Sequence, residues 1–177
     1  MELELLTLVA LFGVALIAGF IDAIAGGGGL LTVPALLATG MPPALVLGTN
    51  KLQSSFGSFS ATWFYARRGL LEWGIIWPAV ICTFIGAALG TLAVQTIDAA
   101  ILERLLPFLL VAFACYFYFS PRVSDAESQR RLTPMMFALL VGGGVGFYDG
   151  FFGPGTGSFF AIGFVALAGF GMARATA

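Results

Sequence analysis

The sequence predicts an all-α fold, a polytopic bundle of transmembrane helices built from an internal repeat whose helices are broken by glycines. Three observations support this prediction. Of the 177 residues, 59% are hydrophobic and 10% are charged, with a mean hydropathy of +1.00, whereas soluble domains carry about 25% charged residues. Several apolar runs reach the ~20 residues that a membrane-spanning helix needs. One motif, an aspartate followed by a glycine cluster, occurs twice.

The apolar runs define the expected helices in chain order. Residues 5–25 are long enough to span a membrane, and the four glycines at 26–29 then interrupt the helix. The other runs are a short one at 30–38, long ones at 44–66 and 73–94, one at 105–119 that can extend back to residue 101, and a broken pair at 134–152 and 157–172 on either side of GPGTG.

Arginines are distributed unevenly between the expected loops. Two alternate loops contain five of them: Arg67, Arg68, Arg122, Arg130 and Arg131. The intervening loop, 95–104, carries one arginine. Because positively charged loops stay in the cytoplasm, we expect the two arginine-rich loops on the cytoplasmic side and 95–104 outside. The side of the N-terminus depends on whether 30–40 crosses the membrane or re-enters, and the sequence leaves this open.

The chain also repeats itself. GFIDAIAGGGG at 19–29 aligns with GFYDGFFGPGTG at 146–157, and the alignment pairs Asp22 with Asp149. An acidic residue followed by a glycine break at matched spacing favours duplication over chance similarity between apolar segments. We expect a first membrane repeat over 1–133 and the start of a second, incomplete repeat over 134–177. The first copy continues into a Thr-Asn-Lys sequence that the second does not reach, so we expect the chain to be an N-terminal fragment.

Asp22 and Asp149 are the first candidate site residues. An ionisable side chain inside a membrane helix costs at least ~2.5–3.5 kcal/mol on insertion scales, so it usually has a compensating role. One interpretation is that each aspartate reaches water or caps its glycine break. The other is that both line a cavity at the repeat interface and titrate to couple protons.

The glycine breaks are the second candidate. Broken backbone survives in a membrane only where it is buried in protein or lines a water-filled cavity. A helix that restarts after a break, here at Leu30 and near Gly157, points its N-terminal N–H groups at that cavity and favours an anion there. The alternative is simple close packing of small residues. The candidate binding residues are Gly26, Gly27, Gly28, Gly29, Gly153, Gly155 and Gly157.

The segment 44–66 has two different faces. Polar or small residues form one stripe: Asn50, Gln53, Ser54, Gly57, Ser58 and Ala61. Bulky residues form the opposite stripe: Leu52, Phe56, Phe59 and Trp63. In a membrane bundle the small, polar face turns inward. Lys51 either snorkels to the interface or lies near the cavity, where it attracts an anion or pairs with Asp22. The candidate ligands of this segment are Thr49, Asn50, Lys51 and Gln53.

Composition argues against several other kinds of function. The chain has no histidine, so we expect no catalytic residue, metal site or cofactor. A net charge of −1 argues against a nucleic-acid partner. The two cysteines, Cys82 and Cys115, are interpreted as packing residues. Small-residue spacings at Gly86–Gly90 and at 142–146–150 predict close helix–helix contacts.

Two long runs carry a family resemblance. GFIDAIAGGGGLLTVPALLATGMPPALVLGTNKLQSSFGSFSATWFYARRG resembles the first-half signature of the TauE/SafE sulfite-exporter (TSUP) permeases. GFYDGFFGPGTGSFF followed by ARATA fits the second-half signature, so the resemblance covers essentially the whole chain. It implies a transporter permease of the bacterial inner membrane that moves sulfur-containing or organic anions such as sulfite, sulfoacetate or thiosulfate. Members of the family are longer and continue into a Thr-Lys-containing helix.

Taken together, these features predict a multi-pass secondary transporter for a small anionic substrate, in contact with the lipid bilayer. We do not expect an enzyme. The alternatives are a hydrophobic subunit of a membrane enzyme and a membrane assembly protein. The anion, the direction of transport and the existence of a homo-oligomer are left open.

Overall fold

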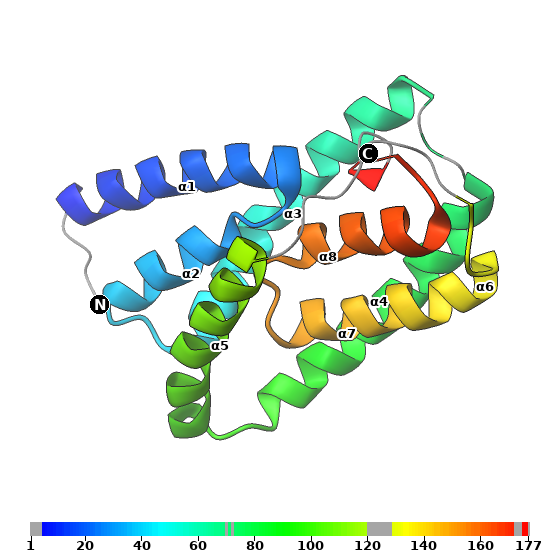
Figure 1. Ribbon diagram of the computed structural model, residues 1–177. Helices are drawn as coiled ribbons and strands as arrows, with labels where there is room; N and C mark the ends of the chain where they lie inside the picture. The colour runs from blue at the N-terminus through cyan, green and yellow to red at the C-terminus, as the bar shows by residue number, and fades with distance from the viewer. Residues whose placement is uncertain (1–4, 70, 72, 120–128, 172–174, 177) are drawn as a thin grey trace.

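Figure 1 shows a computed structural model of the protein, which describes residues 5–69, 71, 73–119, 129–171 and 175–176. Every regular element in these residues is helical, as predicted. The elements are α1 (Leu5–Ala25), α2 (Gly29–Ala38), α3 (Pro43–Arg67), α4 (Trp73–Gln95), α5 (Ala99–Phe119), α6 (Pro134–Phe137), the π-helical η1 (Ala138–Gly143), α7 (Gly144–Phe151), α8 (Thr156–Gly163) and the π-helical η2 (Phe164–Ala168).

Four helical stretches in the described residues are long and apolar enough to cross a membrane: Leu5–Ala23, Ile76–Gln95, Ala99–Tyr116 and Pro134–Phe151. The predicted all-α, polytopic fold is therefore confirmed. α3 has the length to span, at 25 residues, but its polar stripe lowers its hydropathy. Large apolar side chains such as Phe12, Phe56, Phe84 and Phe108 lie exposed on the outside of the bundle, which is the surface that lipid covers.

The helices form two hairpins that point toward each other (Figure 1). In this view α1 runs inward from the left, and α2 returns toward the left. The continuous rod of α6, η1 and α7 runs inward from the right, and α8 returns toward the right. Opposed hairpins of this kind are what inverted repeats produce. The repeat boundaries at 1–133 and 134–177 remain a prediction.

The helix boundaries at the breaks differ slightly from those expected. α2 begins at Gly29 and α8 at Thr156, about one residue earlier than predicted in each case. α5 begins at Ala99, two residues before the earliest predicted start, because the Asp98 carboxylate accepts a hydrogen bond from the Ala100 N–H and caps the helix. None of these shifts moves a residue to another face of the bundle.

α4 and the α6–α7 rod lie in backbone contact along small residues. A Cβ added to Gly146 would lie 2.7 Å from the Cα of Thr83, and one added to Gly150 would lie 2.7 Å from the Cα of Ala87. Gly86 faces α7 in the same way, because a Cβ there would lie 2.9 Å from the Phe147 nitrogen. The predicted close helix–helix contacts are therefore confirmed.

The positions of the loops at the two ends of the bundle agree with the expected alternation of arginine-rich and arginine-poor loops. The end of α3 and the start of α6 lie toward one end, whereas the connection from α4 to α5 lies toward the other (Figure 1). Arg68 follows α3, and Arg131 precedes α6. Arg122 lies outside the described residues. Which end faces the cytoplasm remains a prediction.

Candidate functional site

A cavity of about 400 Å³ lies where the tips of the two hairpins meet α3. Eight of the predicted site residues line it: Asp22, Gly26, Gly29, Asn50, Asp149, Gly153, Gly155 and Gly157. The polar stripe of α3 also faces it through Ser54, Gly57, Ser58 and Ala61. The structure thus brings both aspartates, both glycine breaks and the polar face of α3 to one place.

The two breaks touch each other through backbone. A Cβ added to Gly157 would lie 2.7 Å from the Cα of Gly26, and the Ser158 hydroxyl donates a hydrogen bond to the carbonyl of Gly26. Gly26 and Gly155 have φ values of +61° and +85°, a left-handed conformation that glycine adopts without the penalty of a Cβ. Glycine is therefore needed at these tips both for chain reversal and for close approach.

Asp22 caps the first break. Its Oδ1 accepts hydrogen bonds from the N–H groups of Gly27 at 2.8 Å and Gly28 at 2.7 Å. This is one of the two interpretations that the sequence left open, although Asp22 also borders the cavity. A carboxylate at this position stabilises the positive end of α2.

Gly27 and Gly28 do not line the cavity. Their N–H groups point at Asp22, so they do not supply the anion-binding amides that were predicted for them. A Cβ added to Gly28 would lie 2.7 Å from Oδ2 of Asp22 and 2.8 Å from the carbonyl carbon of Ala18. A side chain at Gly28 would therefore collide with α1, and it would not obstruct a ligand in the cavity directly.

Asn50 supplies a buried polar group at the cavity wall. Its side chain is 3% exposed, and its Oδ1 accepts a hydrogen bond of 2.6 Å from the Thr32 hydroxyl. This bond fixes the amide so that Nδ2 lies 3.2 Å from the position of a Cβ on Gly29, at the start of α2. In the part of the chain that the structure describes, no protein group accepts a hydrogen bond from Nδ2.

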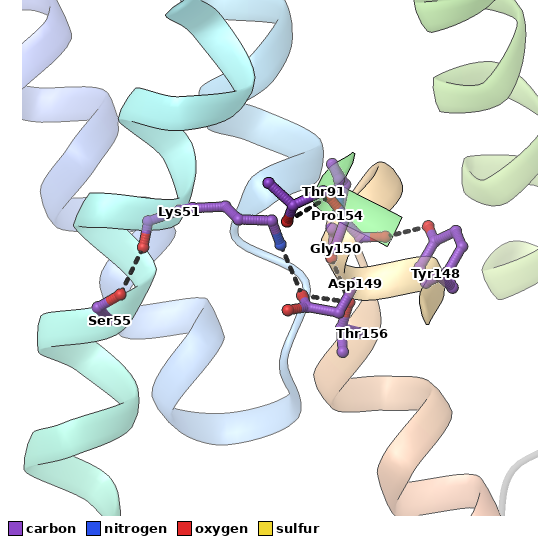
Figure 2. A network of polar contacts seen from close by, with 9 residues as sticks. Lys51, Ser55, Thr91, Tyr148, Asp149, Gly150, Pro154 and Thr156 are labelled. Atoms are coloured by element: carbon purple, nitrogen blue, oxygen red, sulfur yellow. Dashed lines mark hydrogen bonds and ion pairs between the residues drawn. The ribbon is translucent and has the colours of Figure 1, made fainter. Parts of the chain in front are cut away.

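Lys51 crosses from α3 to the second break and pairs with Asp149 (Figure 2). Its Nζ lies 3.1 Å from Oδ1 of Asp149, and the two side chains are 31% and 34% exposed. The expectation of a pair with Asp22 is therefore wrong, because the Asp22 carboxylate is turned into its own glycine break. The Lys51 ammonium group thus lies beside a cavity-lining residue.

Thr49 and Gln53 lie away from the cavity. Thr49 is exposed, with its hydroxyl 3.9 Å from the sulfur of Met41. The Gln53 amide donates to the carbonyl of Ala15 on α1 at 3.1 Å. Gln53 lies at the edge of the polar face of α3 and is turned toward α1, and Thr49, four residues before it, lies on the same side of the helix as Gln53. Their predicted contact with substrate is not supported by this placement.

Three hydroxyl residues of the site did not appear among the predicted ligands. Thr32 fixes Asn50, Ser158 joins the two tips, and Thr156 donates to Oδ1 of Asp149 at 2.9 Å. All three lie in the first turns of the restarting helices, a position that could have indicated them. Tyr148 fixes the second break, since its hydroxyl donates to the carbonyl of Pro154 (Figure 2).

The cavity is lined by hydrogen-bond donors as well as by the carboxylates of Asp22 and Asp149. Among the described residues, no group of three or more His, Cys, Asp and Glu side chains could hold a metal. The cavity instead presents the Asn50 amide, hydroxyl groups and the N-terminal ends of α2 and α8.

The chain is similar to known and probable membrane transporters. A family model described as "Sulfite exporter TauE/SafE" matches residues 11–177. A "Probable membrane transporter protein" of Haemophilus influenzae is 50% identical over 177 residues, which are 100% of this chain and 69% of the relative. "Probable membrane transporter protein YfcA" of Escherichia coli K12 is 51% identical over 172 residues, 97% of this chain and 64% of the relative.

A third relative, "Probable membrane transporter protein ORF9" of a Sinorhizobium species, is 53% identical over 167 residues, which are 94% of this chain and 64% of the relative. The chain thus spans about two thirds of the length of the curated relatives that it matches. No solved structure matches the chain.

Proposed function

Because the chain belongs to the TauE/SafE sulfite exporter family, we propose that the protein is a secondary transporter for small anions and that the cavity between the two glycine breaks binds its substrate. The substrates that we propose are sulfur-containing or organic anions, such as sulfite, sulfoacetate or thiosulfate. The proposal includes a location in the bacterial inner membrane, the absence of enzymatic activity and the two-repeat organisation described above.

The observation that carries the proposal is the buried amide of Asn50. Among the described residues no buried side-chain nitrogen or oxygen lacks a hydrogen-bond partner. The Nδ2 group, which has no protein acceptor, is therefore open to the cavity, where a ligand or water accepts its hydrogen bonds. The Thr32 hydroxyl already occupies Oδ1. The amide therefore offers N–H donors to the cavity, which suits an anionic oxygen.

The helix ends add favourable electrostatics at the same place. α2 and α8 both begin at the cavity, at Gly29 and Thr156, and Asp22 already caps the first of them. The positive ends of helix dipoles stabilise anions by about 0.3–1 kcal/mol each near a surface, and by more where water is excluded. Broken helices that face each other across a binding site are a recurrent feature of secondary transporters.

Asn50→Asp is the sharpest test of this site. The change keeps the shape of the side chain and an oxygen for Thr32, but it replaces the donor in the cavity with a negatively charged acceptor. We expect binding of thiosulfate or sulfoacetate by the purified protein, measured by calorimetry in detergent, to fall by at least about tenfold, the equivalent of one charged hydrogen bond.

Gln95→Glu is the matched control, because it adds the same charge at the exposed end of α4. This variant should bind like the wild type. Normal binding by Asn50→Asp, with helicity unchanged in both variants, would place the site elsewhere. Failure of the wild-type protein to bind any anion of the panel would contradict the proposed function itself.

A further inference from the structure

The positive charge nearest to the cavity is already engaged. Lys51 and Asp149 lie 3.1 Å apart, so an anion that enters the cavity meets an ammonium group that a carboxylate has neutralised. Asp22 borders the same cavity, which leaves a net charge of −1 on these three side chains when both carboxylates are ionised. An anion would be repelled by this arrangement unless one carboxylate takes up a proton.

Asp149 has partners for both of its protonation states. When it is ionised, its Oδ1 accepts from Lys51 and from the Thr156 hydroxyl at 2.9 Å. That hydroxyl has a single hydrogen and a second, closer acceptor, the carbonyl of Gly153 at 2.5 Å. If the hydrogen goes to Gly153, a lone pair of Thr156 Oγ1 faces Asp149. A protonated Asp149 can then donate to Thr156, and both the carboxyl group and the hydroxyl group keep a hydrogen-bond partner.

Asp22 is held differently, although it occupies the equivalent place in the repeat. Its Oδ1 accepts from two backbone N–H groups, those of Gly27 and Gly28. Backbone donors cannot rotate away or become acceptors. These bonds hold the Asp22 carboxylate against its own glycine break, whereas the Asp149 carboxylate is paired with Lys51. The two aspartates of the repeat have therefore taken different roles.

Few charged groups surround Asp149. Lys51 faces it from α3, and Asp22 on α1 lines the same cavity. On its own helix the Tyr148 hydroxyl is turned to the Pro154 carbonyl. From α4 the nearest polar contact to this turn is the Thr91 hydroxyl, which donates to the carbonyl of Gly150 (Figure 2). The side chains of Lys51 and Asp149 are each about one-third exposed, so water can deliver a proton.

We propose that Asp149 takes up one proton when an anion binds and that this proton releases Lys51 to the anion, so that one proton moves with each anion. This inference rests on the proposed function and deepens it, because it assigns the coupling ion and its carrier. The proton comes from water, binds a carboxylate oxygen of Asp149 and leaves with the anion on the other side. Lys51 is the switched counter-charge, and Asp22 stays bound to its glycine break.

The test is the pH dependence of anion binding by the purified natural protein in detergent. Thiosulfate and sulfoacetate serve as probes, because neither changes its own charge near neutral pH, as sulfite does. If binding requires a proton on Asp149, the Kd of the wild type should rise by about tenfold for each unit of pH above the point at which Asp149 ionises. Binding is therefore tight at low pH and is lost as pH rises.

Asp149→Asn imitates the protonated state and should remove this dependence. We expect the variant to bind at high pH about as tightly as the wild type does at low pH. If Asp149 only anchored Lys51, the variant would bind weakly at every pH, and that result would overturn the inference. Lys51→Met should bind weakly at all pH values, whereas Asp98→Asn, an exposed carboxylate between α4 and α5, should keep the wild-type profile.

A second measurement applies even if Asp149→Asn does not fold. Thiosulfate is added to the unbuffered wild-type protein in the presence of a pH-sensitive dye. The pH should rise by the amount that corresponds to the uptake of one proton per anion bound. Binding without proton uptake, or with a flat pH profile, would overturn the coupling and leave the anion site intact. Failure of both probes to bind would overturn the proposed function together with the coupling.

Discussion

Gly26 and Gly157, which lie in different halves of the chain, are in backbone contact at the tips of the two hairpins. A Cβ on Gly157 would lie 2.7 Å from the Cα of Gly26, a separation that real side chains do not reach. The Ser158–Gly26 hydrogen bond lies beside this contact. The proposed binding cavity depends on it, because residues from both tips line the same space.

Gly157→Ala should therefore push the tips apart. Overpacking of a close contact typically costs about 1–3 kcal/mol, and we expect a lower unfolding temperature in detergent and weaker anion binding. Gly19→Ala is the control, since a Cβ at Gly19 on α1 meets nothing within 4 Å. Equal stability of the two variants would show that the tips are not in contact.

The contact between α4 and α7 makes a separate prediction. Gly146→Ala should lower the free energy of unfolding by about 1–3 kcal/mol, because its Cβ would collide with the backbone of Thr83. Gly144→Ala, two residues away, meets nothing within 4 Å and should be neutral or stabilising by up to about 1 kcal/mol. Denaturant titration followed by circular dichroism measures both. A milder effect at Gly146 than at Gly144 would contradict the packing.

The membrane orientation can be tested with one pair of glutamines. In a background in which both native cysteines are replaced by alanine, Gln129→Cys near the start of α6 should resist an impermeant thiol reagent in intact cells. Gln95→Cys at the opposite end should react, because the arginine-poor connection is expected outside. Both positions are exposed, so burial does not explain a difference. The reverse labelling pattern would show that the protein has the opposite orientation in the membrane.

Tyr148→Phe tests the hydrogen bond that fixes the second break. The hydroxyl donates to the Pro154 carbonyl, and the ring packs against Phe113, Phe152 and Phe159. Loss of the hydroxyl should lower the free energy of unfolding by about 0.5–1.5 kcal/mol, with the ring packing retained. Tyr118→Phe is the matched control, because Tyr118 is 84% exposed. A change of the same size at Tyr118 would show that the effect does not come from Pro154.

Most of the fold was predictable because membrane helices are defined by length and hydropathy. Residues 5–25 were expected as a helix and form α1 with the same bounds. Glycine spacing predicted close helix–helix contacts in α4 and in the α6–α7 rod, but not that these two segments contact each other. The π-helical segments η1 and η2 were not expected, since a change from four- to five-residue hydrogen bonding leaves no clear compositional signal.

The candidate site was predictable to the level of helix faces but not of side-chain partners. Asn50 and both aspartates were expected near the breaks, and they line the cavity. A pair between Lys51 and Asp22 was one of the alternatives that the sequence left open, whereas Lys51 pairs with Asp149, because the repeat makes the two aspartates look equivalent. Only the conformation of each break decides which carboxylate turns inward to its own backbone. Gln53 was included because a polar stripe on a helix has no sharp edge in sequence.

The packing of α4 against α7 has a mechanical consequence. Gly142, Gly146 and Gly150 meet Ala79, Thr83 and Ala87, so small residues recur every four positions on both helices. A slide by one repeat, ~6 Å at a rise of ~1.5 Å per residue, would again set small residues against small ones. The packing of small residues therefore does not by itself fix the axial position of α4 relative to α7. A polar contact between the two helices fixes it instead, because the Thr91 hydroxyl on α4 donates a hydrogen bond to the carbonyl of Gly150 on α7.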